Sequence, residues 1–152
     1  MIDKLRVRAN SESGFTLVEL LVVMLILDLL AAIAIPAFFN QREKAKDSDA
    51  KASVKTMQTA METYSTDNNG SYVGATLAGL VTIEPAISDA PQGTAGATPP
   101  TVSNLAAKTF TVTVTSTTGN TFTINRLIGG NTTLTCTTAG TAGCPTGGSW
   151  AG

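Results

Sequence analysis

The sequence contains no histidine, and only 14% of its 152 residues are charged. Without histidine the chain lacks the commonest general base of enzymes and the commonest metal ligand of proteins. Its formal net charge of −1 excludes the strongly basic surface with which proteins hold nucleic-acid phosphates. We therefore expect a protein that is not an enzyme, holds no cofactor or metal, and has no direct nucleic-acid site.

Cysteine is also scarce. The two cysteines, Cys136 and Cys144, lie close together near the C-terminus and allow a single intramolecular pairing. Disulfides persist outside the cytoplasm, so a bond between them places the C-terminal part outside and the N-terminus inside. The alternative is a pair of reduced thiols in the core.

What the sequence does contain is one long apolar block, over residues 15–39. About 20 apolar residues at 1.5 Å each span a hydrocarbon core, so the block is long enough for a transmembrane helix. A secretory signal peptide is the alternative, because residues 32–34 (AIA) fit a cleavage site. The length of the block and the acids inside it, Glu19 and Asp28, favour the membrane helix. Basic residues flank both ends, so the positive-inside rule does not choose an orientation.

The two acids are unusual in an apolar layer. A carboxylate at the centre of a transmembrane helix costs about 2.5–3.5 kcal/mol. A cut between Gly14 and Phe15 would create a new α-amine one helical turn from Glu19. Between packed helices, this amine and Glu19 would neutralise each other and relieve the penalty of burying both charges. The alternative for Glu19 is an interfacial carboxylate that reaches the membrane surface.

The motif GFTLVELL over residues 14–21, followed by AAIAIP over residues 31–36, resembles the class III leader and N-terminal helix of type IV pilins and pseudopilins. The resemblance implies cleavage after Gly14 by a prepilin peptidase and N-methylation of the new terminus at Phe15. It also implies that Glu19 pairs with the Phe15 amine of a neighbouring subunit during assembly.

The same resemblance implies partners and a location. The protein would be a single-pass prepilin in the cytoplasmic membrane, with its N-terminus inside, and then part of an extracellular filament of identical subunits. Its partners would be the prepilin peptidase and the inner-membrane pilus assembly machinery, and the filament would serve adhesion, motility or DNA uptake.

Two alternatives to the pilus subunit remain. A pseudopilin of a type II secretion system is the related one, although residues 107–152 contain no Asp or Glu for the C-terminal calcium site common in major pseudopilins. A membrane-anchored surface-binding protein that never polymerises is the alternative of a different class.

Asp28 departs from the family pattern, which usually has a small residue there. Nine residues at 100° each place it on the helix face opposite Glu19, so the two acids do not serve one partner. Either Asp28 stays protonated in the membrane, or it favours local unwinding ahead of Pro36, as the family helix is thought to do. Because proline removes a helical hydrogen bond, Pro36 is expected to kink the helix.

Beyond the block, apolar residues at helical spacing predict an amphipathic continuation of the helix over residues 40–69. The stripe consists of Ala50, Val54, Met57, Met61 and Tyr64. Gly70, after Asn68 and Asn69, is suited to a left-handed cap that ends the helix. Several prolines and glycines over residues 70–107 then predict an irregular connecting loop.

In the last third of the chain the period of apolar residues changes to two. Threonines alternate with Phe110, Val112, Val114 and later with Phe122 and Ile124, and Leu134 and Cys136 share one face of a further strand. We expect an α+β fold in which the long helix packs on a small antiparallel sheet of about three or four strands. The expected segments are a cleaved leader (1–14), a transmembrane or filament-core helix (15–39), its amphipathic continuation (40–69), a connecting loop (70–107), and the sheet with a disulfide-closed tail (108–152).

Overall fold

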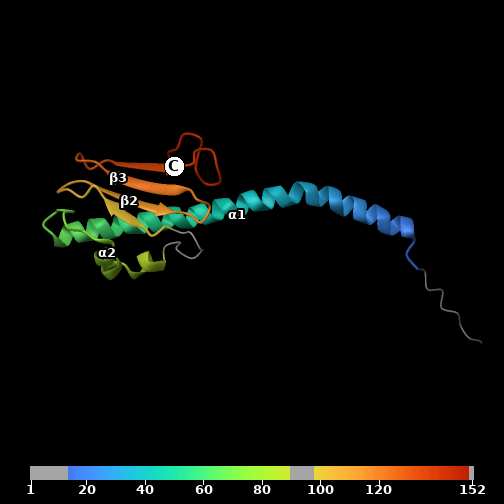
Figure 1. The fold of residues 1–152 in the computed structure, drawn as a ribbon, viewed down its shortest axis with the longest axis horizontal. Helices are drawn as coiled ribbons and strands as arrows, with labels where there is room; N and C mark the ends of the chain where they lie inside the picture. The colour runs from blue at the N-terminus through green and yellow to red at the C-terminus, as the bar shows by residue number, and fades with distance from the viewer. Residues whose placement is uncertain (1–13, 90–97, 151–152) are drawn as a thin grey trace, which may run out of the picture. The chain divides into compact units, whose positions relative to one another are not determined.

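The computed structural model describes residues 14–89 and 98–150. Its elements in chain order are α1 (Leu17–Asp67), α2 (Leu77–Ile83), the 3₁₀ helix η1 (Pro85–Asp89), β1 (Thr101–Ser103), β2 (Phe110–Thr115), β3 (Thr121–Arg126) and β4 (Thr132–Thr137) (Figure 1). The four strands form one antiparallel sheet in the order β1–β2–β3–β4. The predicted α+β class, a long N-terminal helix with a small antiparallel sheet, is confirmed.

The chain divides into two compact units between Ala37 and Phe38. The first unit contains the beginning of α1, and the second, called the head below, contains the rest of α1 and every other element. The helical assignment of α1 runs without a break through Asp28 and Pro36, so the unassembled chain shows no unwinding there. The kink at Pro36 stays a prediction.

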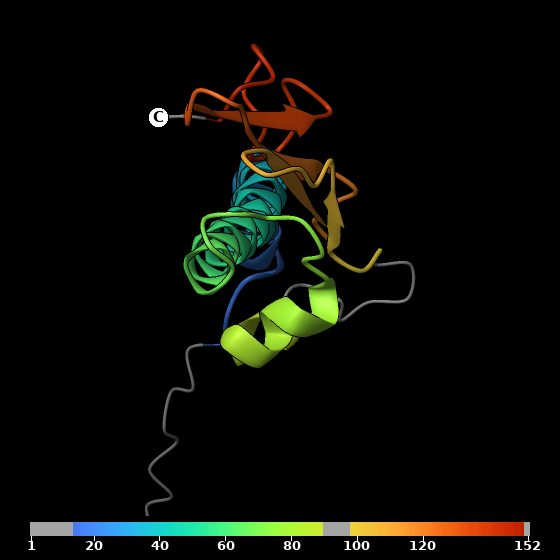
Figure 2. The same ribbon diagram turned by 90° about the vertical axis from the view of Figure 1, so that its left-hand side faces the viewer.

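The core of the head forms between α1 and the inner face of the sheet. From α1 come Ala50, Val54, Met57, Ala60 and Met61, each at most 1% exposed. From the sheet come the alternating residues Phe110, Val112, Val114, Phe122 and Ile124. Each large apolar side chain contributes about 1.5–3 kcal/mol when fully buried, so the apolar stripe and the apolar sheet face are stable only against each other. Figure 2 looks along the head part of α1 and shows the sheet on one side of the helix and α2 on another.

The end of α1 shows how the chain leaves the helix. Asn69 and Gly70 have positive φ angles of 56° and 76°, and the Gly70 N–H donates to the carbonyl of Ser65 (2.7 Å). This six-residue closure is the Schellman motif. The left-handed position directly after the cap is therefore occupied by Asn69, one residue earlier than expected, and Gly70 follows it.

The segment 70–107, expected to be irregular, contains a short helix, a 3₁₀ turn and the edge strand β1. Thr76 caps α2, since its Oγ1 accepts a hydrogen bond from the Gly79 N–H (3.1 Å). Leu80 and Ile87 anchor the segment because both are at most 1% exposed in the core. The prediction gave too much weight to proline and glycine and too little to this cap and to the burial of apolar residues.

The tail after β4 is held on the sheet by several contacts. Cys136 and Cys144 form a disulfide with a sequence separation of eight. The Cys136 N–H donates to the carbonyl of Gly148 (2.8 Å), so the chain returns along β4. Trp150 ends the described tail, and its ring meets the ring of Phe122 edge to face at 6.0 Å.

Candidate functional site

The predicted cleavage site lies immediately ahead of α1, at Gly14 and Phe15. Both residues are exposed, and a Cβ added to Gly14 would meet no atom within 4 Å. The backbone at this point is therefore free of obstruction by the part of the chain that the structure describes. Residues 1–13 of the expected leader lie outside that part.

Thr16 caps the N-terminus of α1. Its Oγ1 accepts a hydrogen bond from the Glu19 N–H (3.1 Å), which satisfies one of the four donors that a helix start leaves free. Glu19 lies in the first turn, where a negative charge is stabilised by the positive end of the helix dipole. The prediction from sequence missed this cap, although Thr-x-x-Glu is the capping-box pattern. The cap places Glu19 one turn from the predicted new terminus at Phe15.

The described part of the first unit, residues 14–37, exposes a largely apolar surface. Its large apolar side chains, from Phe15 to Ile35, are 48–78% exposed. Within the described residues α1 is the one helix long and apolar enough to cross a membrane. An apolar surface of this extent normally contacts lipid or a partner protein. The segment can therefore lie in a bilayer, or pack against like helices.

Two carboxylates interrupt this surface. Glu19 and Asp28 are both exposed, and residues 14–37 contain no lysine or arginine. Neither acid forms an ion pair within the described residues.

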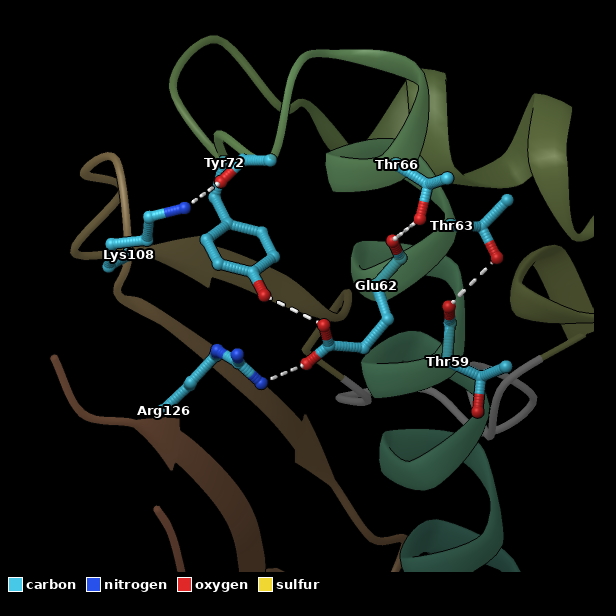
Figure 3. A network of polar contacts seen from close by, with 8 residues as sticks. Thr59, Glu62, Thr63, Thr66, Tyr72, Lys108 and Arg126 are labelled. Atoms are coloured by element: carbon cyan, nitrogen blue, oxygen red, sulfur yellow. Dashed lines mark hydrogen bonds and ion pairs between the residues drawn. The ribbon is translucent and has the colours of Figure 1, made fainter. Parts of the chain in front are cut away.

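A polar network connects the C-terminal end of α1 to the sheet (Figure 3). Glu62 accepts a hydrogen bond from the Tyr72 hydroxyl on one oxygen (2.7 Å) and from the Arg126 guanidinium on the other (2.5 Å). Arg126 also lies over the Tyr72 ring, 5.4 Å from its centre. Burial, followed by the bond to Glu62, raises the pKa of Tyr72 above its ordinary value of 10.0. Because Glu62 and Arg126 are partly exposed, their ion pair adds at most about 1 kcal/mol.

A buried aspartate connects the middle of α1 to the rest of the head. Asp47 is fully buried, and its carboxylate accepts hydrogen bonds from the Thr118 hydroxyl (2.5 Å), the Asn120 amide (2.7 Å) and the Gly143 N–H (2.8 Å). Thr118 and Asn120 belong to the turn between β2 and β3, and Gly143 belongs to the disulfide loop. Asp47 thus joins α1 to two distant parts of the chain.

The pKa of Asp47 reflects this environment. Burial raises it, but the hydrogen bonds from three side chains and one backbone amide outweigh burial, so the pKa lies below its ordinary value of 3.8. The prediction from sequence missed this residue. The available signal was its position, since 47, 50, 54, 57 and 61 continue the apolar stripe and only residue 47 in it is charged.

The described residues contain no group of three or more His, Cys, Asp or Glu side chains that could hold a metal ion. Two acids of the head, Asp47 and Glu62, instead serve as hydrogen-bond acceptors within the fold.

The first part of the chain is similar to known proteins. Residues 9–35 match the family model of the prokaryotic N-terminal methylation motif. The chain is 39% identical over 59 residues to the type II secretion system core protein G of Pseudomonas aeruginosa, a match that covers 39% of this chain and 42% of that protein. It is 45% identical over 51 residues to the type IV major pilin protein PilA of Myxococcus xanthus, with coverages of 34% and 23%.

A third relative is the competence protein ComGC of Halalkalibacterium halodurans, 36% identical over 60 residues, which cover 40% of this chain and 59% of that protein. The chain thus spans less than two thirds of the length of each of these relatives. No solved structure matches the chain significantly.

Proposed function

We propose that this chain is a structural subunit of a type IV pilus, since its start matches the N-terminal methylation motif and is similar to a type IV pilin, a secretion-system core protein and a competence protein. Its named relatives are pilin, pseudopilin and competence proteins and not enzymes. The observation that carries the proposal is the exposed apolar start of α1, which opens at Gly14 and Phe15 and has Glu19 in its first turn.

Assembly follows from the charges and the apolar surface of this segment. Cleavage after Gly14 creates an α-amine at Phe15, and N-methylation leaves that amine charged. Within a bundle of apolar helices the amine of one subunit neutralises Glu19 of its neighbour, and an unpaired charge in such a bundle is costly. The pairing therefore selects one register between adjacent subunits, while the apolar side chains supply the contact area.

The location of the subunit changes during this process. Before assembly the apolar block spans the cytoplasmic membrane, with the N-terminus inside and the head outside, and assembly machinery then moves the subunit into the filament. The disulfide in the head supports this orientation, since such bonds persist outside the cytoplasm. The filament would serve adhesion, motility or DNA uptake.

A pseudopilin of a type II secretion system is the second candidate, and the similarity to core protein G supports it. Residues 107–152 contain no acid, so the tail lacks the carboxylates that a calcium site requires. This lack favours the pilus. The two candidates differ in phenotype: loss of a pilin removes surface filaments, whereas loss of a pseudopilin blocks export of a secreted protein.

We expect Gly14→Leu to leave the leader attached. The present residue has no side chain and the backbone around it is unobstructed, whereas a leucine side chain would stand at the bond that the peptidase must reach. Intact mass measurement of the membrane-extracted subunit should show a start at Met1 and no methylation. Gly129→Leu, at a second glycine with free space around it, is the control and should mature normally. Normal maturation of Gly14→Leu would contradict the assigned cleavage site.

We expect Glu19→Ala to mature normally but to reduce the yield of filaments by roughly tenfold or more, because the neighbour's amine loses its partner inside the apolar bundle. Glu19→Gln tests the charge alone and should fail similarly. Glu43→Ala, which removes an exposed acid from the head part of α1, is the control. Quantification of sheared filaments, together with the mass of the mature N-terminus, measures both steps, and wild-type yield from Glu19→Ala would exclude the pairing.

A further inference from the structure

One side of α1 in the head faces the disulfide loop. Asn40, Lys44, Asp47 and Lys51 follow one another at spacings of four, three and four residues, which places them on one side of the helix. The last two contact the loop directly. The Gly143 N–H donates to Asp47 (2.8 Å), and the Lys51 ammonium donates to the Gly143 carbonyl (2.7 Å). At these two residues α1 and the disulfide loop are therefore in direct contact.

At Asn40 and Lys44, nearer to the apolar block in the sequence, a cavity separates α1 from the disulfide loop. Asn40 and Lys44 line a cavity of about 360 Å³, whose opposite wall is the disulfide loop and the residues after it. The residues of that wall are Gly140, Ala142, Cys144, Pro145 and Thr146. A volume of this size lies in the range of small-ligand sites. No acid lines the cavity, and Lys44 has no ion pair within the described residues.

The first residue that lines the cavity, Asn40, directly follows the apolar block in the sequence. Phe38 and Phe39 end the block, are 66% and 54% exposed, and belong to the head. At a rise of 1.5 Å per residue, Asn40 and Lys44 lie about 1.5 and 7.5 Å beyond Phe39 along the helix. The headgroup layer on each side of a bilayer is roughly 5–7.5 Å thick. When Phe39 lies at the edge of the hydrocarbon core, the cavity is therefore level with the lipid headgroups.

The charges around the cavity favour an anion. Residues 40–46 contain three basic side chains, Arg42, Lys44 and Lys46, and one acid, Glu43, and all are exposed. The disulfide loop contributes no acid. Asp47 is the acid nearest to the cavity on the same helix side, but its oxygens already accept hydrogen bonds from the sheet turn and the loop. An anion in the cavity thus meets an ammonium and an amide.

We propose that this cavity binds the phosphate of an anionic membrane lipid while the unassembled subunit stands in the bilayer. Lys44 forms the ion pair with the phosphate and Asn40 donates a hydrogen bond to it. The lipid holds the base of the head at the membrane surface and is left behind when the subunit enters a filament. The inference rests on the proposed function in one respect, namely that the apolar block spans a bilayer.

The test uses the full chain in nanodiscs that contain equal amounts of phosphatidylglycerol and phosphatidylcholine. After mild detergent extraction, native mass spectrometry measures the fraction of subunits that retain phosphatidylglycerol. Lys44→Gln should lower this fraction about fivefold, because the ion pair with the phosphate, which contributes about 1 kcal/mol, is lost. Lys46→Gln is the matched control, because it removes the same charge about 3 Å further along the helix, on another side. It should stay within about twofold of the wild type, because Lys46 does not line the cavity.

Other outcomes have distinct meanings. If both variants lost bound phosphatidylglycerol equally, the retention would reflect diffuse attraction by basic residues, and the proposed site would be wrong. It would also be wrong if Lys44→Gln retained as much of the lipid as the wild type. Displacement of the lipid by millimolar inorganic phosphate would assign the cavity to a soluble anion and overturn the lipid. Failure of the chain to enter nanodiscs would overturn the membrane span of the proposed function, whereas selective retention by a chain that assembles no filament would still support the site.

Discussion

Asp47→Ala is expected to lower the free energy of unfolding of the head by about 2–4 kcal/mol. The substitution removes a fully buried carboxylate and leaves the Thr118 hydroxyl, the Asn120 amide and the Gly143 N–H without their acceptor. Unsatisfied buried donors of this kind cost about 1–3 kcal/mol each, and the sum is reduced where water or a neighbouring carbonyl replaces the lost partner. No other single side chain in the described residues joins α1 to both the sheet turn and the disulfide loop.

Urea unfolding of the full chain in detergent measures this loss. Trp150, the one tryptophan in the sequence, packs against Phe122 in the core, so its fluorescence reports on the head. Asp49→Ala removes an exposed acid two residues away and should change stability by less than about 0.5 kcal/mol. Similar losses in the two variants would show that Asp47 has no special role.

The same residue predicts a response to acid. The pKa of Asp47 in the folded head lies below its ordinary value, because the hydrogen bonds outweigh the effect of burial. Its stabilising contribution is therefore complete above the unfolded-state pKa of about 3.9 and is lost as the pH falls through the lower folded value. Asp47→Asn, which cannot titrate, should flatten this part of the stability profile. An unchanged acid profile in Asp47→Asn would contradict the assignment.

Cys136→Ser is expected to destabilise the head by about 2–3 kcal/mol. The disulfide closes a loop of about eight residues and thereby lowers the conformational entropy of the unfolded chain. The loop carries Gly143, which donates to Asp47 and accepts from Lys51. Opening the loop therefore also loosens the contacts of Asp47. The apolar start of α1 should stay helical by circular dichroism, because the disulfide and its contacts belong to the other unit, the head.

Limited proteolysis and thiol labelling test this prediction. The variant should be cut faster after β4 than the wild type, whereas Thr146→Ser, an equally small change beyond the bridge, should not differ. Combining Cys136→Ser with Asp47→Ala should cost less than the sum of the single losses, because both changes release the same loop. Two freely reactive thiols in the native, unreduced subunit would exclude the bridge.

The start of the chain could be understood from its sequence because its properties are local. The long apolar run, the positions of Gly14 and Phe15 and the acid at Glu19 are all read within a few helical turns. The sheet was predictable for a similar reason, since a period of two shows which face of each strand is buried. The cap at Thr16 was equally local, and its pattern was overlooked.

The middle of the chain was less predictable because its structure depends on distant contacts. Whether Leu80 and Ile87 become anchors is decided by the core that receives them. Proline and glycine nearby lower the local preference for regular structure. Burial of the anchors and the cap at Thr76 then outweigh that preference, and α2 forms.

By itself the sequence determined the long apolar helix, the α+β class and the alternation of each strand, because hydrophobic periodicity acts over short distances along the chain. Only the tertiary structure decided that Asp47 is a buried acceptor, that Glu62 joins Arg126 and Tyr72, and that Lys44 borders an open cavity. Each of these brings together residues far apart in the chain. The role of a charged side chain depends on which hydrogen-bond donors the fold places beside it, and this cannot be predicted from residue spacing in the sequence.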